Sequence, residues 1–395
     1  MSCMRLIHGQ LKLPLIPRTP FAPRNASYSR MLSTRNYHNV VRQASKQQAI
    51  NTTPYLDSPN TIAKPLLASR NTRGISNMST STPKPTIAVI SIGQMGLGIA
   101  SLLLATGYRV ITNVSDRSTA TQTRAKNANI ECLSSDTDLV QQADYILSIV
   151  PPRDAIATAQ RIETALRSTQ NATSSKVVHY LDLNAISPTT ARQIEAIFTP
   201  LRPTIVFIDG GIIGAPPSLS RTTSPESNSS LEKWTKPGIP ISGPDSISDT
   251  ELISVLNMRF VNEKIGSASG LKCCFAALSK GFTALVLQSF STASSLGVYA
   301  HLQDYLEENN PGAGEKARKS VVGCTTKAYR WVEEMRQIGE TFDVEGGWQG
   351  RAQVFREIAG VFEGLADVVE REGAGKLGDA EGVVRGLGEG LRKSG

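Results

Sequence analysis

The segment Ile87–Ala100 reads IAVISIGQMGLGIA, in which a run of apolar residues passes through a glycine turn into a helix-forming stretch. A strand, a glycine turn and a helix in this order open the dinucleotide-binding α/β folds. Gly93 would let a pyrophosphate approach the backbone at the helix N-terminus, where free N–H groups favour anions, and Gly96 would let the helix pack closely on the sheet. Ser91 stands where the first glycine of G-x-G-x-x-G usually stands. An ordinary tight turn is the alternative to a cofactor site formed by Gly93, Gln94, Met95 and Gly96.

Strand-like and helix-like stretches alternate on either side of this turn and beyond it. The predicted strands are Thr86–Ile90, Arg109–Thr112, Tyr145–Val150, Val177–Leu181 and Thr204–Ile208, and helices are expected near 94–106, 118–127, 153–168 and 188–198. This order predicts an α/β domain of Rossmann type, with a parallel, doubly wound sheet covered on both faces.

Strand patterns end near residue 265, and apolar residues at helical spacing follow. One predicted long helix includes Leu271, Phe275, Leu278, Phe282, Leu285 and Phe290, and another runs through 329–338. We therefore expect a Rossmann domain over 85–265 and an all-α C-terminal domain over 266–395. Within the first domain, 218–238 begins with Ser, Thr, Pro and Asn without an apolar period and is predicted to be an inserted loop. The glycine-rich tail from Gly373 is expected to fray.

The basic charge of the chain is concentrated at its front. The formal net charge is +8, but residues 1–84 contain twelve basic residues and one acid, which leaves 30 basic and 33 acidic residues for the rest. A basic nucleic-acid-binding face on the folded part is therefore not required. The composition of 1–84 is that of a disordered leader or a mitochondrial transit segment. We expect a mitochondrial matrix protein, or a cytoplasmic one if translation starts at Met78.

The sequence gives little support for a metal site, a disulfide framework or a membrane helix. The five cysteines form no C-x-x-C pair and have no histidine at metal-ligand spacing, so neither a zinc site nor a disulfide framework is expected. No stretch reaches the roughly 18 to 20 uninterrupted apolar residues of a membrane helix. We expect no metal, no nucleic acid and no membrane partner.

The Gly93–Gly96 turn, with Ala100 following, resembles that of the β-hydroxyacid dehydrogenase family, which includes 3-hydroxyisobutyrate dehydrogenase and the 6-phosphogluconate dehydrogenases. Three further segments follow in the family's order. Asp182–Pro188 is similar to its substrate loop, Asp209–Ala215 to its glycine-rich substrate turn, and Gly266–Lys272 to the segment with its catalytic lysine. Lys327–Met335 is similar to stretches in the helical domain of a less-characterised branch of 6-phosphogluconate-dehydrogenase-like proteins, and the resemblance is strongest to this branch.

The resemblance implies a role for particular residues. Lys272 would be the catalytic general acid and base, with Lys280 as the runner-up. The implied substrate-binding residues are Asp182, Asn184, Gly210, Gly211 and Gly214. The chain departs from the family where Ile213-Gly214-Ala215 replaces Ser-Gly-Gly and where Ala276 replaces Asn. We also expect a homodimer through the helical domain.

The cofactor is predicted from the end of the second strand, where NAD sites place an acidic residue. That position falls on Val114, and a group of donors follows it, so NADP is favoured over NAD. Arg117 can hold a 2′-phosphate through two parallel charged hydrogen bonds. Asp116 is the alternative: if the second strand ended two residues later, Asp116 would occupy the acidic position and accept hydrogen bonds from the ribose. The predicted cofactor residues outside the glycine turn are Ser115, Arg117, Ser118, Val150, Pro151 and Pro152; the two prolines either line the nicotinamide pocket or merely end a strand.

The leading hypothesis is an NADP-dependent oxidoreductase acting on CH–OH groups, with hydride transfer between nicotinamide and a small hydroxy or carbonyl compound. Imine reduction on the same scaffold is one alternative, because the altered glycine turn need not hold a carboxylate. The other is a non-catalytic NADP-binding or scaffold protein that kept the cofactor site and lost turnover.

Overall fold

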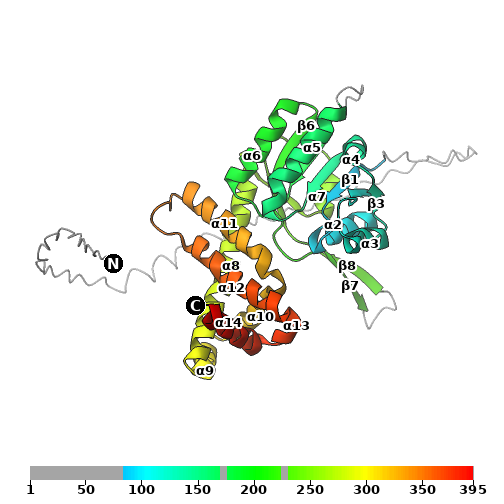
Figure 1. The fold of residues 1–395 in the computed structure, drawn as a ribbon. Coiled ribbons are helices and arrows are strands. Elements are labelled where there is room, and N and C mark those ends of the chain that lie inside the picture. Colours follow the sequence, from blue (N-terminus) through cyan, green and yellow to red (C-terminus); the bar gives the residue numbers. More distant parts are fainter. Residues whose placement is uncertain (1–82, 170–175, 224–229, 395) are drawn as a thin grey trace, which may run out of the picture. The chain divides into compact units, whose positions relative to one another are not determined.

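The computed structural model describes residues 83–169, 176–223 and 230–394 of the 395-residue chain. The predicted leader therefore lies outside the described residues, apart from Pro83 and Lys84 at its end. In the described residues an α/β domain is followed by a helical domain, as predicted (Figure 1).

One eight-stranded sheet, in the order β10-β9-β6-β5-β4-β1-β2-β3, organises the first domain. Its strands are β1 (Thr86–Ile90), β2 (Arg109–Asn113), β3 (Glu131–Leu133), β4 (Tyr145–Ser148), β5 (Val178–Asp182), β6 (Ile205–Gly210), β9 (Ile239–Ser242) and β10 (Met258–Asn262). The six strands from β3 to β6 are parallel and have the order of a dinucleotide-binding sheet, so the predicted doubly wound topology is confirmed. The antiparallel pairing of β9 with β6 was not predicted.

Both faces of the sheet are covered, because alternate residues of its strands enter two different cores. On β1, Ile87 and Val89 pack in one core while Ala88 and Ile90 pack in the other. Helices α2 (Gln94–Ala105), α3 (Thr119–Asn127) and α7 (Thr250–Val255) contribute to the first core. Helices α4 (Asp136–Gln142), α5 (Ala155–Thr169) and α6 (Pro188–Phe198) contribute to the second. Because both faces of the strands are buried, the strand sequences are continuous apolar runs.

The segment predicted to be an inserted loop contains a β-hairpin instead. Strands β7 (Ser218–Thr223) and β8 (Ser230–Thr235) pair antiparallel, and residues 224–229 between them lie outside the described part. Figure 1 shows the two strands extending from the domain. The loop prediction was wrong because a two-stranded ribbon needs little burial: among the hairpin side chains that the structure describes, Trp234, opposite Leu219, packs partly against the core. Such a ribbon leaves almost no apolar period in the sequence.

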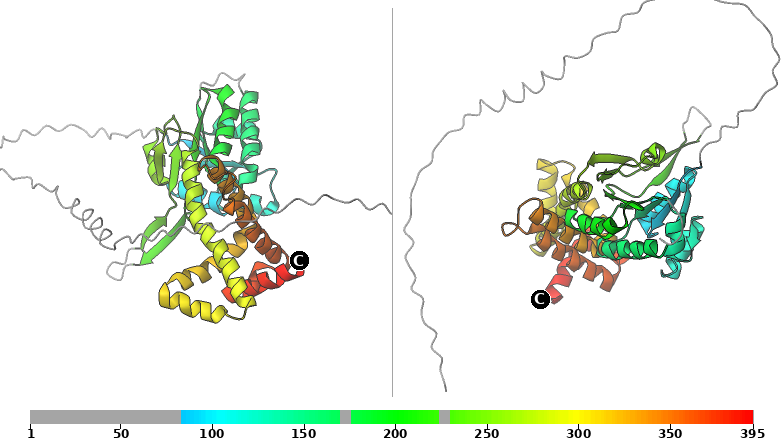
Figure 2. Two further views of the ribbon diagram at one scale, coloured as in Figure 1. Left: turned by 90° about the vertical axis from the view of Figure 1, so that its left-hand side faces the viewer. Right: turned by 90° about the horizontal axis from the view of Figure 1, so that it is seen from above.

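The second domain consists of helices arranged around α8. Its helices are α8 (Ser267–Ser295), α9 (Tyr299–Asn309), α10 (Ala313–Cys324), α11 (Ala328–Val344), α12 (Val354–Glu372), α13 (Ala374–Leu377) and α14 (Ala380–Ser394). In Figure 2, α8 runs as one long helix from the sheet into the other helices. The core of this domain includes Phe290, Met335 and Phe362, and the all-α prediction is confirmed.

The glycine-rich tail does not fray, contrary to expectation. Val383 and Leu387 of α14 are buried in the core of the helical domain. A Cβ at Gly386 would lie 2.9 Å from Leu377 Cδ2, and one at Gly390 would lie 2.6 Å from Val368 Cγ2. The glycines therefore serve close helix packing, which composition alone does not distinguish from flexibility.

The apolar residues that predicted α8 do not all face the core. Leu271, Phe275, Leu278 and Leu285 are exposed, Leu278 by 80%, whereas Phe290 is buried. Alanines form much of the buried face of the helix. By length and composition α8 is the one helix among the described residues apolar enough to cross a membrane, which the sequence analysis did not anticipate; 44% of that window is buried inside the fold.

The strand-to-helix turn contains a backbone conformation that its residue does not favour. Ser91, at the place of the usual first glycine, has φ of +77°. A Cβ at Gly96 would lie 1.9 Å from Ser91 O, so the helix packs directly on this turn. The fold thus holds Ser91 in the left-handed backbone conformation that a glycine usually adopts at this place. This conformation costs an L-residue roughly 1–2 kcal/mol.

We expect Ser91→Gly to raise the free energy of unfolding by about 0.5–1 kcal/mol in urea titrations. The gain is smaller than the strain because glycine loses more backbone entropy on folding. Asn129→Gly is the control: Asn129 has φ of +56°, and asparagine tolerates this region. A less stable Ser91→Gly variant would show that the serine side chain contributes more than the strain costs.

Candidate active site

The predicted site residues gather at one edge of the sheet. Because β1, β4, β5 and β6 are parallel, their carboxyl ends share this edge. The direction of strand order changes at β1, between β4 on one side and β2 on the other. Ligands of open α/β sheets bind at this point, outside the carboxyl ends.

The glycine turn fits a dinucleotide pyrophosphate. Gly93 is the N-cap of α2, and neither a side-chain cap nor a first-turn acid competes for the free N–H groups. A Cβ at Gly93 would have only Ser91 Oγ near it, at 4.0 Å, so the backbone is open to a ligand. Pro217 lies against Gly98 one turn further along, where a Cβ would be 3.0 Å from its Cδ. The turn therefore offers backbone donors at the positive end of a helix.

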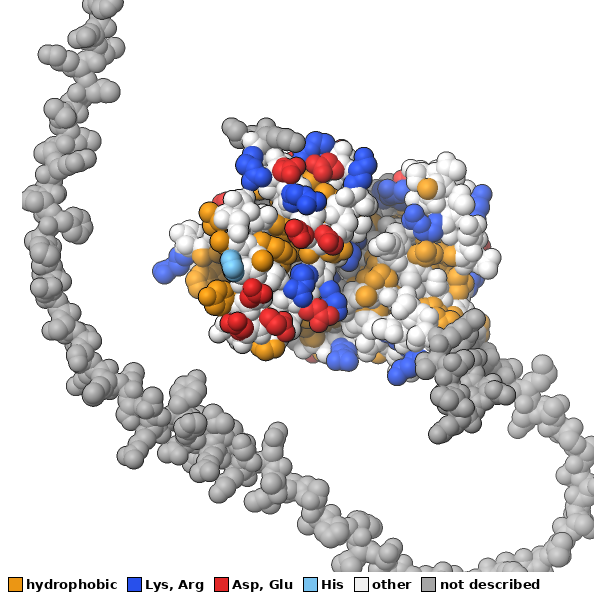
Figure 3. Space-filling view, turned by 90° about the horizontal axis from the view of Figure 1, so that it is seen from below, with side chains coloured by type: hydrophobic (Ala, Val, Ile, Leu, Met, Phe, Trp, Pro, Cys, Tyr) orange, Lys and Arg blue, Asp and Glu red, His pale blue; other side chains and the backbone are white. Residues whose placement is uncertain are grey.

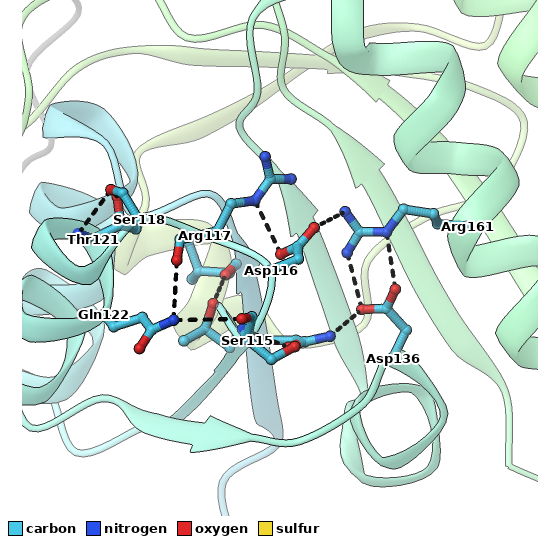
Figure 4. A network of polar contacts seen from close by, with 11 residues as sticks. Ser115, Asp116, Arg117, Ser118, Thr121, Gln122, Asp136 and Arg161 are labelled. Atoms are coloured by element: carbon cyan, nitrogen blue, oxygen red, sulfur yellow. Dashed lines mark hydrogen bonds and ion pairs between the residues drawn. The ribbon is translucent and has the colours of Figure 1, made fainter.

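Asp116 and Arg117 follow β2 and take part in a chain of ion pairs (Figure 4). Arg117 Nε lies 3.3 Å from Asp116 Oδ1, and Asp116 Oδ2 lies 3.7 Å from Arg161 Nη1. Arg161 in turn donates to Asp136 Oδ2 at 2.9 Å. Figure 4 shows the two terminal nitrogens of Arg117 pointing away from Asp116. Asp116 is thus held by two arginines, while Arg117 keeps donors for a further anion.

The remaining residues predicted around the adenosine end have local partners. Val114 is buried in the core and offers no carboxylate. Ser115 donates its hydroxyl hydrogen bond to Asn113 Oδ1 at 2.8 Å, and Ser118 caps α3 by accepting from Thr121 N. Arg161 and Asp136 were not predicted from the sequence, because no local pattern links them to the end of β2.

Asp182 and Asn184 lie at the carboxyl end of β5, but they bind the protein itself. Asn184 Oδ1 accepts from Val150 N at 2.7 Å, and its Nδ2 donates to Asp182 Oδ2 at 2.9 Å and to Ser148 Oγ at 3.1 Å. Both residues are buried, and burial raises the pKa of Asp182 to about 7. Asn184 therefore positions the Val150-Pro151-Pro152 turn, in which Pro151 is exposed and Pro152 is buried.

Asp209 was not predicted as a site residue, yet it connects the two domains. Its buried carboxylate accepts hydrogen bonds from the amides of Gly266, Ala268 and Ser269 at 3.0–3.1 Å. It also accepts from the hydroxyls of Ser242 and Ser269. Burial raises the pKa of Asp209, and these donors oppose the rise. A carboxylate at the end of β6 thus caps the first turn of α8, where it also meets the positive end of the helix dipole.

Lys272 follows one turn after this cap. Its Nζ donates to Ile212 O, in the segment predicted to be the glycine-rich substrate turn. A Cβ at Gly211 would lie 2.9 Å from Lys272 Cβ, so this glycine makes room for the lysine stem. Burial and the charge of Arg330 lower the pKa of Lys272 from 10.5 to about 8. The amine can therefore exchange a proton near neutral pH.

The other predicted members of the turn have structural roles. A Cβ at Gly210 would lie 2.7 Å from Leu183 Cδ2, and Gly214 has φ of +127°. Ile213 pairs with Gly238 in an isolated antiparallel bridge. Lys280, the runner-up, is paired with Glu334 of α11.

Hydrogen bonds hold the helical domain against this edge. Ser187, the N-cap of α6, donates its hydroxyl to Glu340 Oε2 at 2.6 Å and its amide to Gln337 Oε1 at 2.8 Å. Gly266, at φ of +95°, lies where a Cβ would be 2.8 Å from Pro188 Cβ. The placement of α8 and α11 is therefore fixed by contacts with both β6 and α6.

Comparisons with known proteins agree with this architecture. Residues 86–171 match the family model described as "NADP oxidoreductase coenzyme F420-dependent", and residues 293–365 match "Domain of unknown function (DUF1932)". The predicted resemblance is confirmed. The first domain is of the nicotinamide-dinucleotide-binding type, and the second carries the uncharacterised module.

Individual relatives carry little functional information. An uncharacterized 28.5 kDa protein of Methanothermus fervidus is 27% identical over 256 residues, which are 62% of this chain and 88% of that protein. A conserved hypothetical protein from Sinorhizobium meliloti 1021 has TM-score 0.52 at 22% identity, covering 78% of this chain and 97% of that one. A conserved protein of unknown function, described as structurally similar to 3-hydroxyacid dehydrogenases, has TM-score 0.49 at 22% identity, with coverages of 71% and 97%.

We expect Asp209→Asn to lower the free energy of unfolding by roughly 3 kcal/mol or more in urea titrations. The amide nitrogen would face N–H and O–H donors, leaving buried groups unsatisfied. Glu263→Gln, which neutralises an exposed carboxylate just before the same helix, is the control and should change little. Equal stability of the Asp209 variant and the wild type would contradict the capping role.

Proposed function

We propose that the protein is an NADP-dependent oxidoreductase that transfers hydride between nicotinamide and a small hydroxy or carbonyl compound. The observation that carries this proposal is the partly buried Lys272 amine, which donates to Ile212 O beside Gly211 and whose pKa is lowered by burial to about 8. It lies next to the carboxyl edge of a sheet whose first segment matches NADP oxidoreductases. A non-catalytic scaffold gives no reason to bury a titratable amine there.

The roles of the residues follow from their positions. The α2 N-terminus would hold the pyrophosphate, and Arg117 the 2′-phosphate. A bound NADP would donate or accept the hydride. Lys272 takes the proton of a substrate hydroxyl in oxidation and returns it to the carbonyl oxygen in reduction. Gly211 keeps the space beside its stem clear, and Asn184 orients the Val150 turn.

The proton transfer fixes the sign of the pH dependence. As a base Lys272 must be neutral, so oxidation should accelerate as pH rises through about 8. As an acid it must be charged, so reduction should slow as pH rises above the same value. Opposite slopes in the two directions would report a single titrating group.

Lys272→Met removes only the ammonium from an unbranched stem. Turnover should fall roughly 10²- to 10⁴-fold, the range of positioned acid–base groups, and the pH dependence near 8 should disappear. NADPH consumption with a panel of aldehydes, keto acids and imines measures this. Lys264→Met, an exposed lysine preceding the same helix, should keep full activity. Unchanged turnover of the Lys272 variant would reject the catalytic assignment.

Arg117→Ala tests the preference for NADP. We expect NADPH binding to weaken by about 1–2 kcal/mol, less than a buried charged hydrogen bond because Arg117 is 43% exposed and shared with Asp116. NADH binding should be nearly unchanged, since it has no 2′-phosphate. Fluorescence titration of both nucleotides makes the comparison, and equal weakening would assign Arg117 a structural role.

We further propose a homodimer through the exposed apolar side chains of α8. Leu271, Phe275, Leu278 and Leu285 recur at spacings of four, three and seven residues, as on a helix seam. Leu278→Glu should give a monomer by light scattering after gel filtration. Val354→Glu, a substitution at an exposed apolar residue of α12, should not. A monomeric wild type would remove this proposal without affecting the catalytic one.

A further inference from the structure

Arg161 of α5 joins two carboxylates near the end of β2 (Figure 4). It donates to Asp136 through two nitrogens, with Nε at 2.9 Å from Oδ2 and Nη2 at 3.1 Å from Oδ1. Asp136 also accepts from Nδ2 of Asn113, the last residue of β2, at 2.8 Å. The guanidinium of Arg161 is therefore fixed relative to the end of this strand.

The pair of Arg161 and Asp136 is partly shielded from water. The two side chains are 32% and 20% exposed. Burial opposes the charged form of Asp136, but hydrogen bonds from Arg161 and Asn113 outweigh it and lower the pKa of this carboxyl. Two parallel hydrogen bonds between a guanidinium and a carboxylate also restrict the orientation of both groups. Arg161 is thus held in place by an anion that stays ionised at neutral pH.

The third nitrogen of Arg161 faces Asp116. Nη1 lies 3.7 Å from Asp116 Oδ2, and Arg117 Nε lies 3.3 Å from the other oxygen, Oδ1. At 3.7 Å the contact is an ion pair and not a hydrogen bond, so Arg161 acts on Asp116 through its charge. Each oxygen of the Asp116 carboxylate therefore has an arginine beside it, and the two arginines balance the charges of Asp116 and Asp136.

Asp116 on its own would work against NADP. NAD sites use an acidic residue after the second strand to accept hydrogen bonds from the ribose hydroxyls, and NADP carries a phosphate on one of these hydroxyls. A carboxylate without a partner at this place would repel the phosphate and favour NAD. The side chain of Asp116 is 56% exposed and follows β2 by three residues, in the segment where this choice is made. The cofactor preference therefore depends on what neutralises Asp116.

We propose that Arg161 is a positioning residue that sets the cofactor preference: it neutralises Asp116 and thereby lets a 2′-phosphate bind beside that carboxylate. Arg117 is left to bind the phosphate, because its Nε is next to Asp116 while its terminal nitrogens point away from it. The proposal rests on the proposed function, since it concerns the selectivity of the same nucleotide site. It assigns Arg161 no contact with the nucleotide.

The test measures the binding of NADPH and NADH to the full chain by fluorescence, with no substrate present. Arg161→Gln removes the charge but keeps an amide that can donate to Asp136. We expect NADPH binding to weaken about tenfold, because a partly exposed carboxylate loses its cation. NADH binding should tighten by about threefold, because Asp116 is freed to accept the ribose hydroxyls. Arg167→Gln, which removes an exposed arginine of the same helix, is the matched control and should bind both nucleotides like the wild type.

A second substitution separates this role from a structural one. In Arg161→Gln the group that repels the phosphate is Asp116, so adding Asp116→Asn should restore NADPH binding to within about threefold of the wild type. Arg161→Lys keeps the charge and should lose less than Arg161→Gln. The difference between Arg161→Gln and the wild type should also shrink at high salt, because partly exposed charges are screened.

Equal weakening of NADPH and NADH in Arg161→Gln would show a structural role and would overturn the proposal. Failure of Asp116→Asn to restore NADPH binding would overturn it as well, since Arg161 would then bind the phosphate itself.

Binding and turnover distinguish this inference from the proposed function. If the preference for NADPH depends on Arg161 and Asp116 as stated but no carbonyl compound or imine is reduced, the inference is supported and the proposed function fails. If carbonyl compounds are reduced and Arg161→Gln keeps the wild-type preference for NADPH, the function is supported and the inference fails.

Discussion

The hydrogen bonds between the Asp209 carboxylate and the first turn of α8 determine where the other site residues lie. β6 ends in the buried carboxylate, and three amides and two hydroxyls donate to it. Five donors around one buried anion allow little change of angle. The direction of α8 is set there, and with it the position of Lys272 one turn along and of every helix packed on α8.

A second set of contacts holds the helical domain from the other side. Ser187 at the start of α6 binds Gln337 and Glu340 of α11, and Cys273 Sγ lies 3.3 Å from Ile186 O. Lys272 is therefore enclosed between the end of β6 and two helices. Burial there lowers the pKa of its amine. On the face of the molecule shown in Figure 3, acidic and basic side chains intermingle among apolar ones.

The parts of the fold predicted from sequence are those with a strong local period. The strand, turn and helix of Ile87–Ala100 and the parallel order that follows were recognised because buried strands leave continuous apolar runs. β9, β10, α4 and α7 were missed because they are short, and four of the five residues of β10 are exposed. The tail was misread because glycines at a helix contact look like glycines in a flexible segment.

The site residues singled out from sequence lie close together in part. Lys272 donates to Ile212 O and Gly211 lies against its stem, while its catalytic role stays a prediction. Asp182 and Asn184 were expected to bind the substrate, but their polar atoms bind one another, and Asn184 also binds Ser148 of β4 and the amide of Val150. Asp209 was not singled out, because its importance lies in hydrogen-bond partners far along the chain. Contacts between residues so far apart produce no recognisable pattern in a single sequence.

A direct test of the account is the titration of Lys272 by NMR of its labelled side chain, with Lys272→Met identifying the resonance. The account predicts a pKa near 8, and a shift toward the ordinary value in Asp209→Asn, where the helix start is loosened. A pKa of about 10.5 in the wild-type protein would contradict it, since the amine would then be a solvated surface cation.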